Sequence, residues 1–120
     1  MIKIAFLFTS PPYGCANSRE GLDALLAATA FCEPEELAVY FMGDGVLNLI
    51  KDQNPTNILQ KDFTPAFKLL NVFDIENIFV CNEDMNKYSL LDENMLIPCH
   101  IISRKNLMLN LKKAEKILTF

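Results

Sequence analysis

The sequence predicts a single α/β domain in which a mostly parallel sheet of about five strands is flanked by helices. Its 120 residues are enough for one hydrophobic core, and we expect one domain over residues 1–120. Short apolar runs alternate with longer segments of helical period, which predicts strand–helix–strand units. The apolar runs are continuous rather than alternating, and this pattern is typical of parallel strands that are covered on both faces.

Five apolar runs are the candidate strands. In chain order they are residues 2–8, 37–42, 78–81, 97–102 and 117–120. Right-handed crossovers between such strands produce a doubly wound domain. Because ligands in doubly wound folds gather beyond the carboxyl ends of the strands, three loops are candidates for a ligand site. These loops are residues 9–15, 43–45 and 81–84.

Helices are expected between the strands, and polar residues mark where they begin. Asn17 and Glu20 have the spacing of a capping box, which predicts a helix from residue 17 to about residue 31. Residues 43–45 predict a tight turn because two glycines flank an aspartate. The expected caps, in chain order, are Asn17, Asp62 or Thr64, Asn82 and Ser103.

The last predicted helix carries the basic cluster of the chain. The cluster consists of Arg104, Lys105, Lys112, Lys113 and Lys116. Leu107, Leu111 and Ala114 form the inward stripe of this helix, whereas Met108 and Leu109 lie beside the outward lysines. The cluster is either a contact for RNA or an acidic partner, or a solvated helix face.

Apolar residues also stand where the first helix is expected to meet solvent. Ala24, Ala27 and Ala28 lie largely opposite its inward leucines, where a solvated helix would carry charge. They are either plain helix formers or a second packing surface. Together with Met108 and Leu109 they give more hydrophobic surface than a monomer usually exposes, which predicts association with other chains.

Composition excludes several classes of protein. With 11 basic and 15 acidic residues the net charge is −4, the wrong sign for a protein that holds nucleic acid unaided. Nowhere do about 18 apolar residues run together, so we expect no membrane contact. The apolar run at residues 4–8 is too short for the core of a signal peptide, and we expect a cytoplasmic protein.

Few residues have side chains suited to catalysis or to binding a metal or cofactor. The four cysteines, Cys15, Cys32, Cys81 and Cys99, contain no CxxC pair, so we expect reduced thiols and no metal site. The loop of residues 9–14 has two prolines and lacks the glycines of a phosphate-binding loop, so we expect no flavin or dinucleotide cofactor. His100 is the single histidine, which leaves little for acid–base catalysis.

Cys81 is the one candidate catalytic residue. It ends an apolar strand and precedes a short helix, whose amides favour a thiolate and lower the thiol pKa. Glu83 and Asp84 bring two negative charges into the same turn, which opposes ionisation. A thiolate that holds a persulfide and an inert core thiol are the two interpretations of this residue.

Three segments resemble the TusC branch of the DsrF-like family. They are residues 19–27 (REGLDALLA), 41–46 (FMGDGV) and 67–76 (FKLLNVFDIE), and the opening residues 3–6 (KIAF) match as well. The resemblance covers nearly the whole chain and implies a DsrEFH-like fold. It also implies a subunit of the TusBCD complex, a heterohexamer with two copies each of three related chains, so the implied partners are TusB-like and TusD-like chains.

The complex implied by the resemblance accepts sulfur as a persulfide and passes it, through a downstream sulfur carrier protein, toward the 2-thiouridine of tRNA wobble positions. Contact with tRNA is therefore indirect. In the family the sulfur-carrying cysteine belongs to the TusD-like subunit, at the strand end where Cys81 stands here. TusD-like chains follow that cysteine with small and then basic residues, whereas this chain has Asn82, Glu83 and Asp84.

Three functional hypotheses follow. The first is a non-catalytic, positioning subunit of a sulfurtransferase assembly. The second is a persulfide-carrying sulfurtransferase with Cys81 as its nucleophile. The third is a flavodoxin-like module that binds a small molecule, which rests on fold analogy alone.

Overall fold

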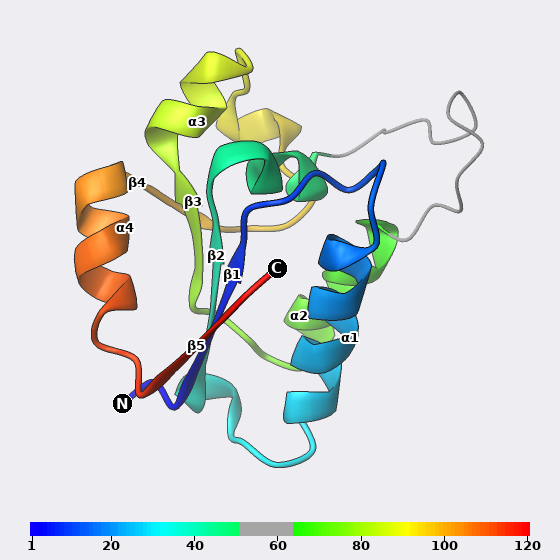
Figure 1. Ribbon diagram of the computed structural model, residues 1–120, viewed down its shortest axis with the longest axis vertical. Coiled ribbons are helices and arrows are strands. Elements are labelled where there is room, and N and C mark those ends of the chain that lie inside the picture. Colours follow the sequence, from blue (N-terminus) through cyan, green and yellow to red (C-terminus); the bar gives the residue numbers. More distant parts are fainter. Residues whose placement is uncertain (51–63) are drawn as a thin grey trace.

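The computed structural model describes residues 1–50 and 64–120, and a five-stranded sheet runs through its centre (Figure 1). The strands are β1 (Ile4–Phe8), β2 (Leu37–Phe41), β3 (Ile78–Cys81), β4 (His100–Ile102) and β5 (Lys116–Thr119). Their order in the sheet is β4-β3-β2-β1-β5, and every neighbouring pair is parallel. The predicted fold class is confirmed, and the sheet is wholly parallel.

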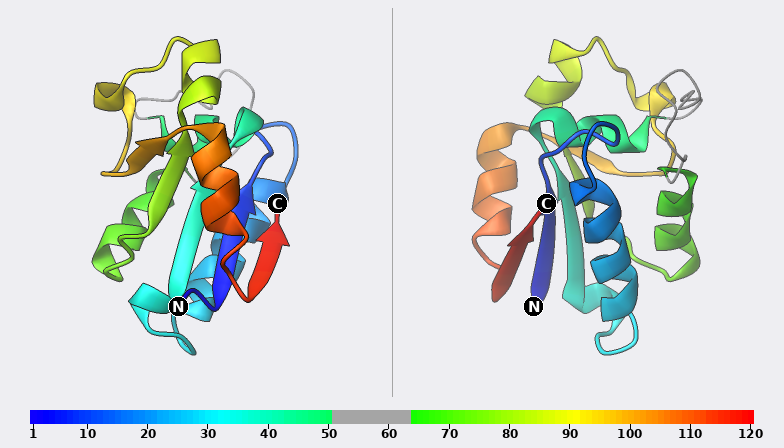
Figure 2. Two further views of the ribbon diagram at one scale, coloured as in Figure 1. Left: turned by 90° about the vertical axis from the view of Figure 1, so that its left-hand side faces the viewer. Right: turned by 45° about the vertical axis from the view of Figure 1, so that its right-hand side comes forward.

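Helices cover both faces of the sheet. They are α1 (Asn17–Ala28), α2 (Leu69–Val72), α3 (Asn82–Lys87) and α4 (Arg104–Leu111). Figure 2 shows α1 and α2 on one face and α4 on the opposite face, with α3 beyond the carboxyl ends of the strands. No helix in residues 1–50 and 64–120 is long and apolar enough to cross a membrane.

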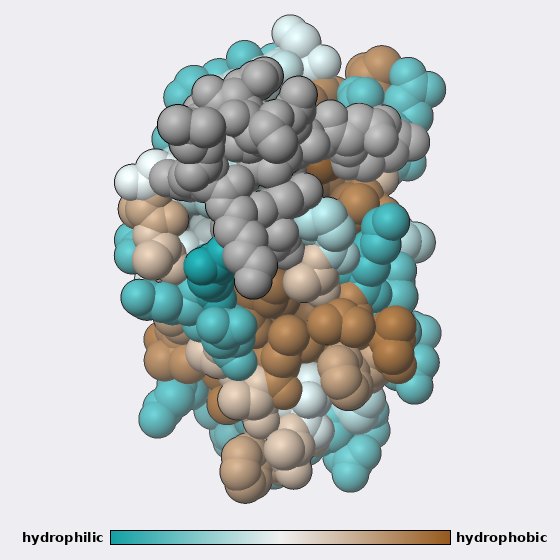
Figure 3. Space-filling view, turned by 90° about the vertical axis from the view of Figure 1, so that its right-hand side faces the viewer, coloured by the Kyte–Doolittle hydropathy of each residue, from teal (hydrophilic) through white to brown (hydrophobic). Residues whose placement is uncertain are grey.

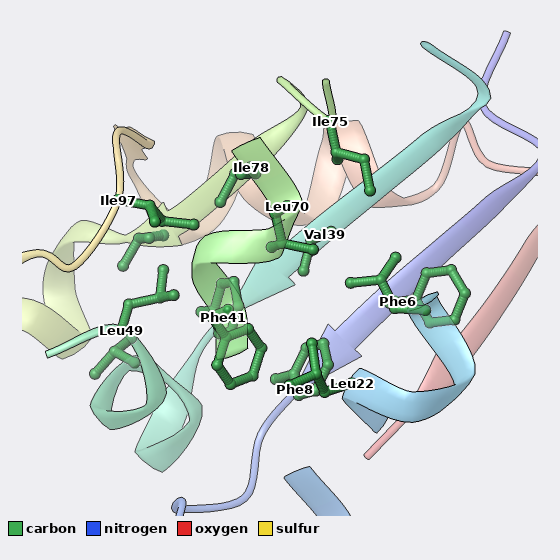
Figure 4. Packing of buried hydrophobic residues seen from close by; sticks show 14 of the residues in the cluster. Phe6, Phe8, Leu22, Val39, Phe41, Leu49, Leu70, Ile75, Ile78 and Ile97 are labelled. Atoms are coloured by element: carbon green, nitrogen blue, oxygen red, sulfur yellow. The ribbon is translucent and has the colours of Figure 1, made fainter. Parts of the chain in front are cut away.

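Side chains alternate between two hydrophobic clusters along each central strand. Phe6 and Phe8 belong to the larger cluster, which lies beneath α1 and α2 and is drawn in Figure 4. Ala5 and Leu7 belong to the smaller cluster, which also contains Leu107 of α4. Since successive strand residues point to opposite faces, the continuous apolar runs of the sequence supply both layers of the core.

Three predicted strands are shorter than expected, and the second of them ends at Phe41 rather than at residue 42. The first begins at Ile4 rather than at residue 2, because the pairing of β1 with both neighbours begins there. The fourth begins at His100 rather than at residue 97. Pro98 lacks an amide donor, and the chain before it pairs elsewhere, with the Leu96 amide donating to the Leu49 carbonyl.

The caps predicted at Asn17 and Asn82 are wrong by one position. Each is the first residue of its helix, and neither α1 nor α3 has a side-chain cap. The Asn17 side-chain amide instead donates to Ser10 Oγ at 3.3 Å, which ties α1 to the preceding loop. The cap predicted at Ser103 is confirmed, because its hydroxyl accepts a hydrogen bond from the Asn106 amide at 3.2 Å.

The remaining helix predictions are met in part. Asp62 lies outside the described residues, and Thr64 opens a 3-10 helix, Thr64–Lys68, that continues into α2. The first helix ends at Ala28 rather than near residue 31, because the Ala28 carbonyl then accepts hydrogen bonds from the amides of Phe31 and Cys32 in a turn.

The tight turn predicted at residues 43–45 is present, because the Gly45 amide donates to the Met42 carbonyl at 2.9 Å, but it continues as a 3-10 helix, Gly43–Leu49. Gly45 lies directly against β1, and a Cβ atom there would stand 1.9 Å from the Phe8 carbonyl oxygen. Glycine is therefore required by close backbone approach, and the helix packs tightly on the carboxyl end of β1.

Candidate functional site

The three loops singled out from the sequence meet at the carboxyl edge of the sheet. The Gly43 amide donates to Asp84 Oδ2 at 2.6 Å, which joins the loop after β2 to α3. The Asn48 side-chain amide donates to the Ser10 carbonyl at 3.1 Å, which joins the 3-10 helix Gly43–Leu49 to the loop after β1. The parallel order of the strands makes this meeting possible, because all carboxyl ends lie on one edge.

Asp84 is the centre of this edge. It is 6% exposed, and its Oδ1 atom accepts a hydrogen bond from Arg104 Nη2 at 2.8 Å, so that α3 and α4 are joined by an ion pair. Burial by itself would raise the pKa of Asp84, but the Gly43 amide, the Cys81 thiol and Arg104 together hold that pKa below its ordinary value. Asp84 is therefore an anion that holds three segments of chain together.

Glu83 occupies the start of the last helix. Its Oε1 atom accepts a hydrogen bond from the Arg104 backbone amide at 2.9 Å, and this bond lowers the pKa of Glu83. An amide at the beginning of a helix has no partner inside the helix, so a carboxylate there satisfies it. Glu83 thus acts as a partner for the N-terminus of α4.

Cys81 lies between these two carboxylates. It is fully buried, and its Sγ lies 3.9 Å from Glu83 Oε1, to which the thiol donates. Burial is the main cause that raises the thiol pKa, and hydrogen bonding to the Asp84 carboxylate and its charge act in the same direction. The Asp84 backbone amide does lower this pKa, as predicted for the helix amides, but burial and negative charge outweigh it and the net pKa is raised. At neutral pH the thiol is protonated, so it is a weak nucleophile.

The other cysteines and the histidine lie apart from this edge. Cys15 is exposed on the loop after β1, and Cys32 is half-buried near the amino end of the sheet. Cys99 precedes β4, and burial raises its pKa to about 11. The ring of His100 packs against Phe79 with ring centroids 5.3 Å apart, so its visible role is packing on the sheet.

The basic cluster divides in two. Arg104 is bound to Asp84 and belongs to the carboxyl edge. The four lysines, Lys105, Lys112, Lys113 and Lys116, are exposed, and none forms an ion pair among the described residues. Lys112 and Lys116 lie beyond the end of α4, which stops at Leu111. Leu107 and Leu111 are buried as predicted, and Ala114 is half-buried beyond the helix.

Sequence reasoning treated Asp84 as a charge beside Cys81 and missed its partners. Gly43 is 41 residues away from Asp84 and Arg104 is 20 residues away, so no local pattern connects them. One signal was available: all three follow strands whose carboxyl ends share an edge in a parallel sheet. An acidic residue after one strand and a basic residue after the next are candidates for pairing there.

The described residues show no group of three or more metal-binding side chains. A pocket lined by Pro34, Glu35, Asp74, Glu76 and Asn77 lies at the amino end of β2 and β3, away from Cys81. The carboxyl edge therefore offers a buried anion, a guanidinium and a protonated thiol. This arrangement joins chain segments and is poorly suited to nucleophilic attack.

Apolar side chains are exposed on both helical layers. On the α1–α2 side, brown side chains gather in Figure 3. The exposed large residues of that side are Phe31, Leu69, Val72 and Phe73, whereas Met108, Leu109 and Ile117 are exposed near α4 and β5. Ala24 and Ala28 of α1 are half-buried and pack against the core, so their predicted place on the outer side of the helix is wrong. Ala27 is exposed, as predicted.

Comparison with known proteins gives a consistent result along the whole chain. A model of the DsrE/DsrF-like family matches residues 2–120. The chain is 49% identical over 119 residues to a protein of Haemophilus influenzae named Protein TusC homolog, covering 99% of this chain and 100% of the relative. A Pasteurella multocida protein of the same name is 47% identical over 119 residues, with the same coverage. The crystal structure of the ychN protein from E. coli superposes with a TM-score of 0.83 at 19% identity, covers both chains completely and supports the fold alone.

Proposed function

Because this chain belongs to the DsrE/DsrF-like family, we propose that it is a subunit of a sulfur-relay complex that passes persulfide sulfur toward 2-thiolation of the wobble uridine in tRNA. The proposed partners are TusB-like and TusD-like chains in a cytoplasmic heterohexamer and a downstream sulfur carrier protein, with tRNA reached only through them. The support is the full-length similarity to proteins named TusC homolog.

Within that complex the chain positions a sulfur-carrying sister chain and does not carry sulfur itself. The observation that carries this part of the proposal is the surroundings of Cys81, a fully buried thiol with a raised pKa that donates to Glu83. Sulfur transfer needs a thiolate that reaches a donor persulfide. Both requirements are opposed here, because the sulfur is out of contact with solvent and its proton is stabilised by negative charge.

The first experiment tests the positioning role in the intact complex. The chain is co-expressed with its TusB-like and TusD-like sister chains, and 2-thiouridine in tRNA is measured by mass spectrometry. We expect Cys81→Ala to leave thiolation near the wild-type level, whereas replacing the strand-end cysteine of the TusD-like chain abolishes it. Loss of thiolation in Cys81→Ala, with the complex still assembled, would show that this chain is a carrier.

A second candidate function is favoured by the position of Cys81 at the junction of β3 and α3. In that function the Cys81 thiolate attacks the outer sulfur of a donor persulfide. A new S–S bond forms at Cys81, the S–S bond of the donor breaks, and the donor leaves as a thiolate. Intact mass after incubation with a low-molecular-weight persulfide distinguishes the two functions. We expect no added sulfur that maps to Cys81, and an exposed residue, Cys15, serves as the internal comparison.

A further inference from the structure

An apolar strip with a basic border lies along α4 and the neighbouring edge of the sheet. We call it the α4 strip. Its apolar members are Met108, Leu109 and Ile117, which are 37%, 51% and 43% exposed. Its basic members are Lys105, Lys112 and Lys113, all of them exposed.

Helix geometry places Leu109 at the centre of the outward side of α4. Leu107 and Leu111 are buried and define the inward direction. At about 100° per residue, Leu109 points almost directly away from that direction, and Lys105 lies beside it. Lys112 and Lys113 follow in the turn directly after the helix. A solvated helix normally carries a polar residue at this outermost position, so the exposed leucine needs an explanation.

The flank of α4 nearer β5 continues the apolar surface. The Asn110 side chain, on one flank of α4, accepts a hydrogen bond from the Tyr40 hydroxyl of β2 at 2.5 Å. Met108 is about 200° from Asn110 around the helix and therefore lies on the opposite flank. Ile117 of β5 pairs with Ala5, whose side chain faces the α4 layer, so Ile117 faces that layer too.

Among residues 1–50 and 64–120, no helix covers β5 on this face. The left view of Figure 2 shows α4 in front of the central strands and β5 beside it, at the edge of the sheet. Ile117 is therefore exposed, although Ala5, its neighbour on the same face of the sheet, is buried. The strip joins an uncovered sheet edge to the outer side of a helix, and such an apolar surface with a polar border is typical of protein interaction sites.

Charge indicates the chemistry of the partner. Residues 104–120 contain five basic side chains and one acidic side chain, Glu115, in a chain whose net charge is −4. Arg104 is bound to Asp84, and Lys116 pairs with Ile4 on the opposite face of the sheet, which leaves three lysines around the apolar centre. Lysines at the border attract a surface of opposite charge and set its orientation. The partner surface that matches the strip is an apolar patch surrounded by acidic side chains.

A protein surface fits the strip better than RNA. Single-stranded RNA is held by stacking on aromatic side chains or on arginine, and the strip offers aliphatic side chains and lysines. Aliphatic groups gain nothing from phosphates but are favourably buried against another apolar patch. We propose that the α4 strip docks on an acidic, apolar-centred surface of a sister chain of the same complex; this inference rests on the proposed function.

The test uses the chain co-expressed with its TusB-like and TusD-like sister chains. Association is measured by native mass spectrometry and by titration of the sister chains with this chain at about 50 mM and about 500 mM salt. We expect Lys112→Glu/Lys113→Glu to weaken association about tenfold at low salt, with a smaller effect at high salt because ions screen the lysines. Leu109→Ser is expected to weaken association at both salt concentrations, because the apolar contact is not screened.

Matched controls carry the same chemical changes elsewhere. Lys68→Glu/Lys87→Glu reverses two exposed lysines outside the strip, and Leu91→Ser changes a leucine that is 61% exposed. Circular dichroism confirms that each variant folds. We expect both controls to associate as the wild type does. Equal weakening by strip and control variants would overturn the proposal, since it would indicate a general effect of charge.

The remaining outcomes separate this inference from the proposed function. If the wild type assembles and the strip variants assemble equally well, the strip is not the interface while the proposed function stands. If the wild type does not assemble with its sister chains, both are overturned. If the lysine reversals abolish binding of unfractionated tRNA in a filter assay and leave assembly intact, the strip is a nucleic-acid surface and the proposal is wrong.

Discussion

Replacing Asp84 with alanine tests whether this carboxylate joins the loops at the carboxyl edge. The substitution removes the acceptor of the Gly43 amide, a bond of 2.6 Å to a group that is 6% exposed. A hydrogen bond to a buried charged group contributes about 1.5–3 kcal/mol. The Arg104 guanidinium reaches solvent and can bind water instead, so most of the loss arises at Gly43.

We therefore expect Asp84→Ala to lower the free energy of unfolding by about 1.5–3 kcal/mol. In a domain of this size the melting temperature should fall by roughly 6–12 °C. Urea and thermal unfolding of the variant and wild type measure both quantities. Asp23→Ala, at an exposed position of α1, is the matched control and should change stability little. If the two substitutions destabilise the fold equally, Asp84 does not hold the loops.

The same carboxylate predicts a pH dependence. The pKa of Asp84 is lower in the folded chain than its ordinary value of 3.8. Its stabilising contribution is therefore complete above that value and is lost as the pH falls through the lower folded value. We expect the stability difference between wild type and Asp84→Asn to be constant above about pH 5 and to shrink below pH 3.8. A difference that grows on acidification would contradict this assignment.

Two further predictions concern the loops and the thiols. Gly45→Ala should destabilise the fold by about 3 kcal/mol, because its Cβ would stand 1.9 Å from the Phe8 carbonyl oxygen. Gly14→Ala adds a Cβ with no neighbouring heavy atom within 4 Å but keeps a φ of 92°, and should cost about 1 kcal/mol. Equal losses for the two variants in urea unfolding would refute the clash at Gly45. Iodoacetamide at about pH 8 should modify Cys15 well before Cys99, since Cys15 is exposed and burial raises the pKa of Cys99 to about 11. Peptide mass spectrometry measures the order of modification, and the reverse order would contradict the burial of Cys99.

Local patterns in the sequence were sufficient for much of the fold. The apolar run at residues 78–81 predicted β3 to the residue, because a strand buried on both faces must be apolar throughout. Ser103 was correctly assigned as a cap, since its hydroxyl bonds to an amide three residues later. The caps at Asn17 and Asn82 were misplaced by one residue, because Ala16 and Cys81 occupy the cap positions and a local pattern locates a helix start only to within a residue or two.

The sequence alone is enough to predict the layered parallel sheet, the helices on its faces and the exposed apolar residues near the lysines in and after α4. These features depend on periodicity and composition, which neighbouring residues encode. Only the tertiary structure decided the state of Cys81, because its pKa depends on burial and on carboxylates whose positions are set by Gly43 and Arg104. Those partners are distant in the chain, and folding alone brings their charges and amides within hydrogen-bonding distance.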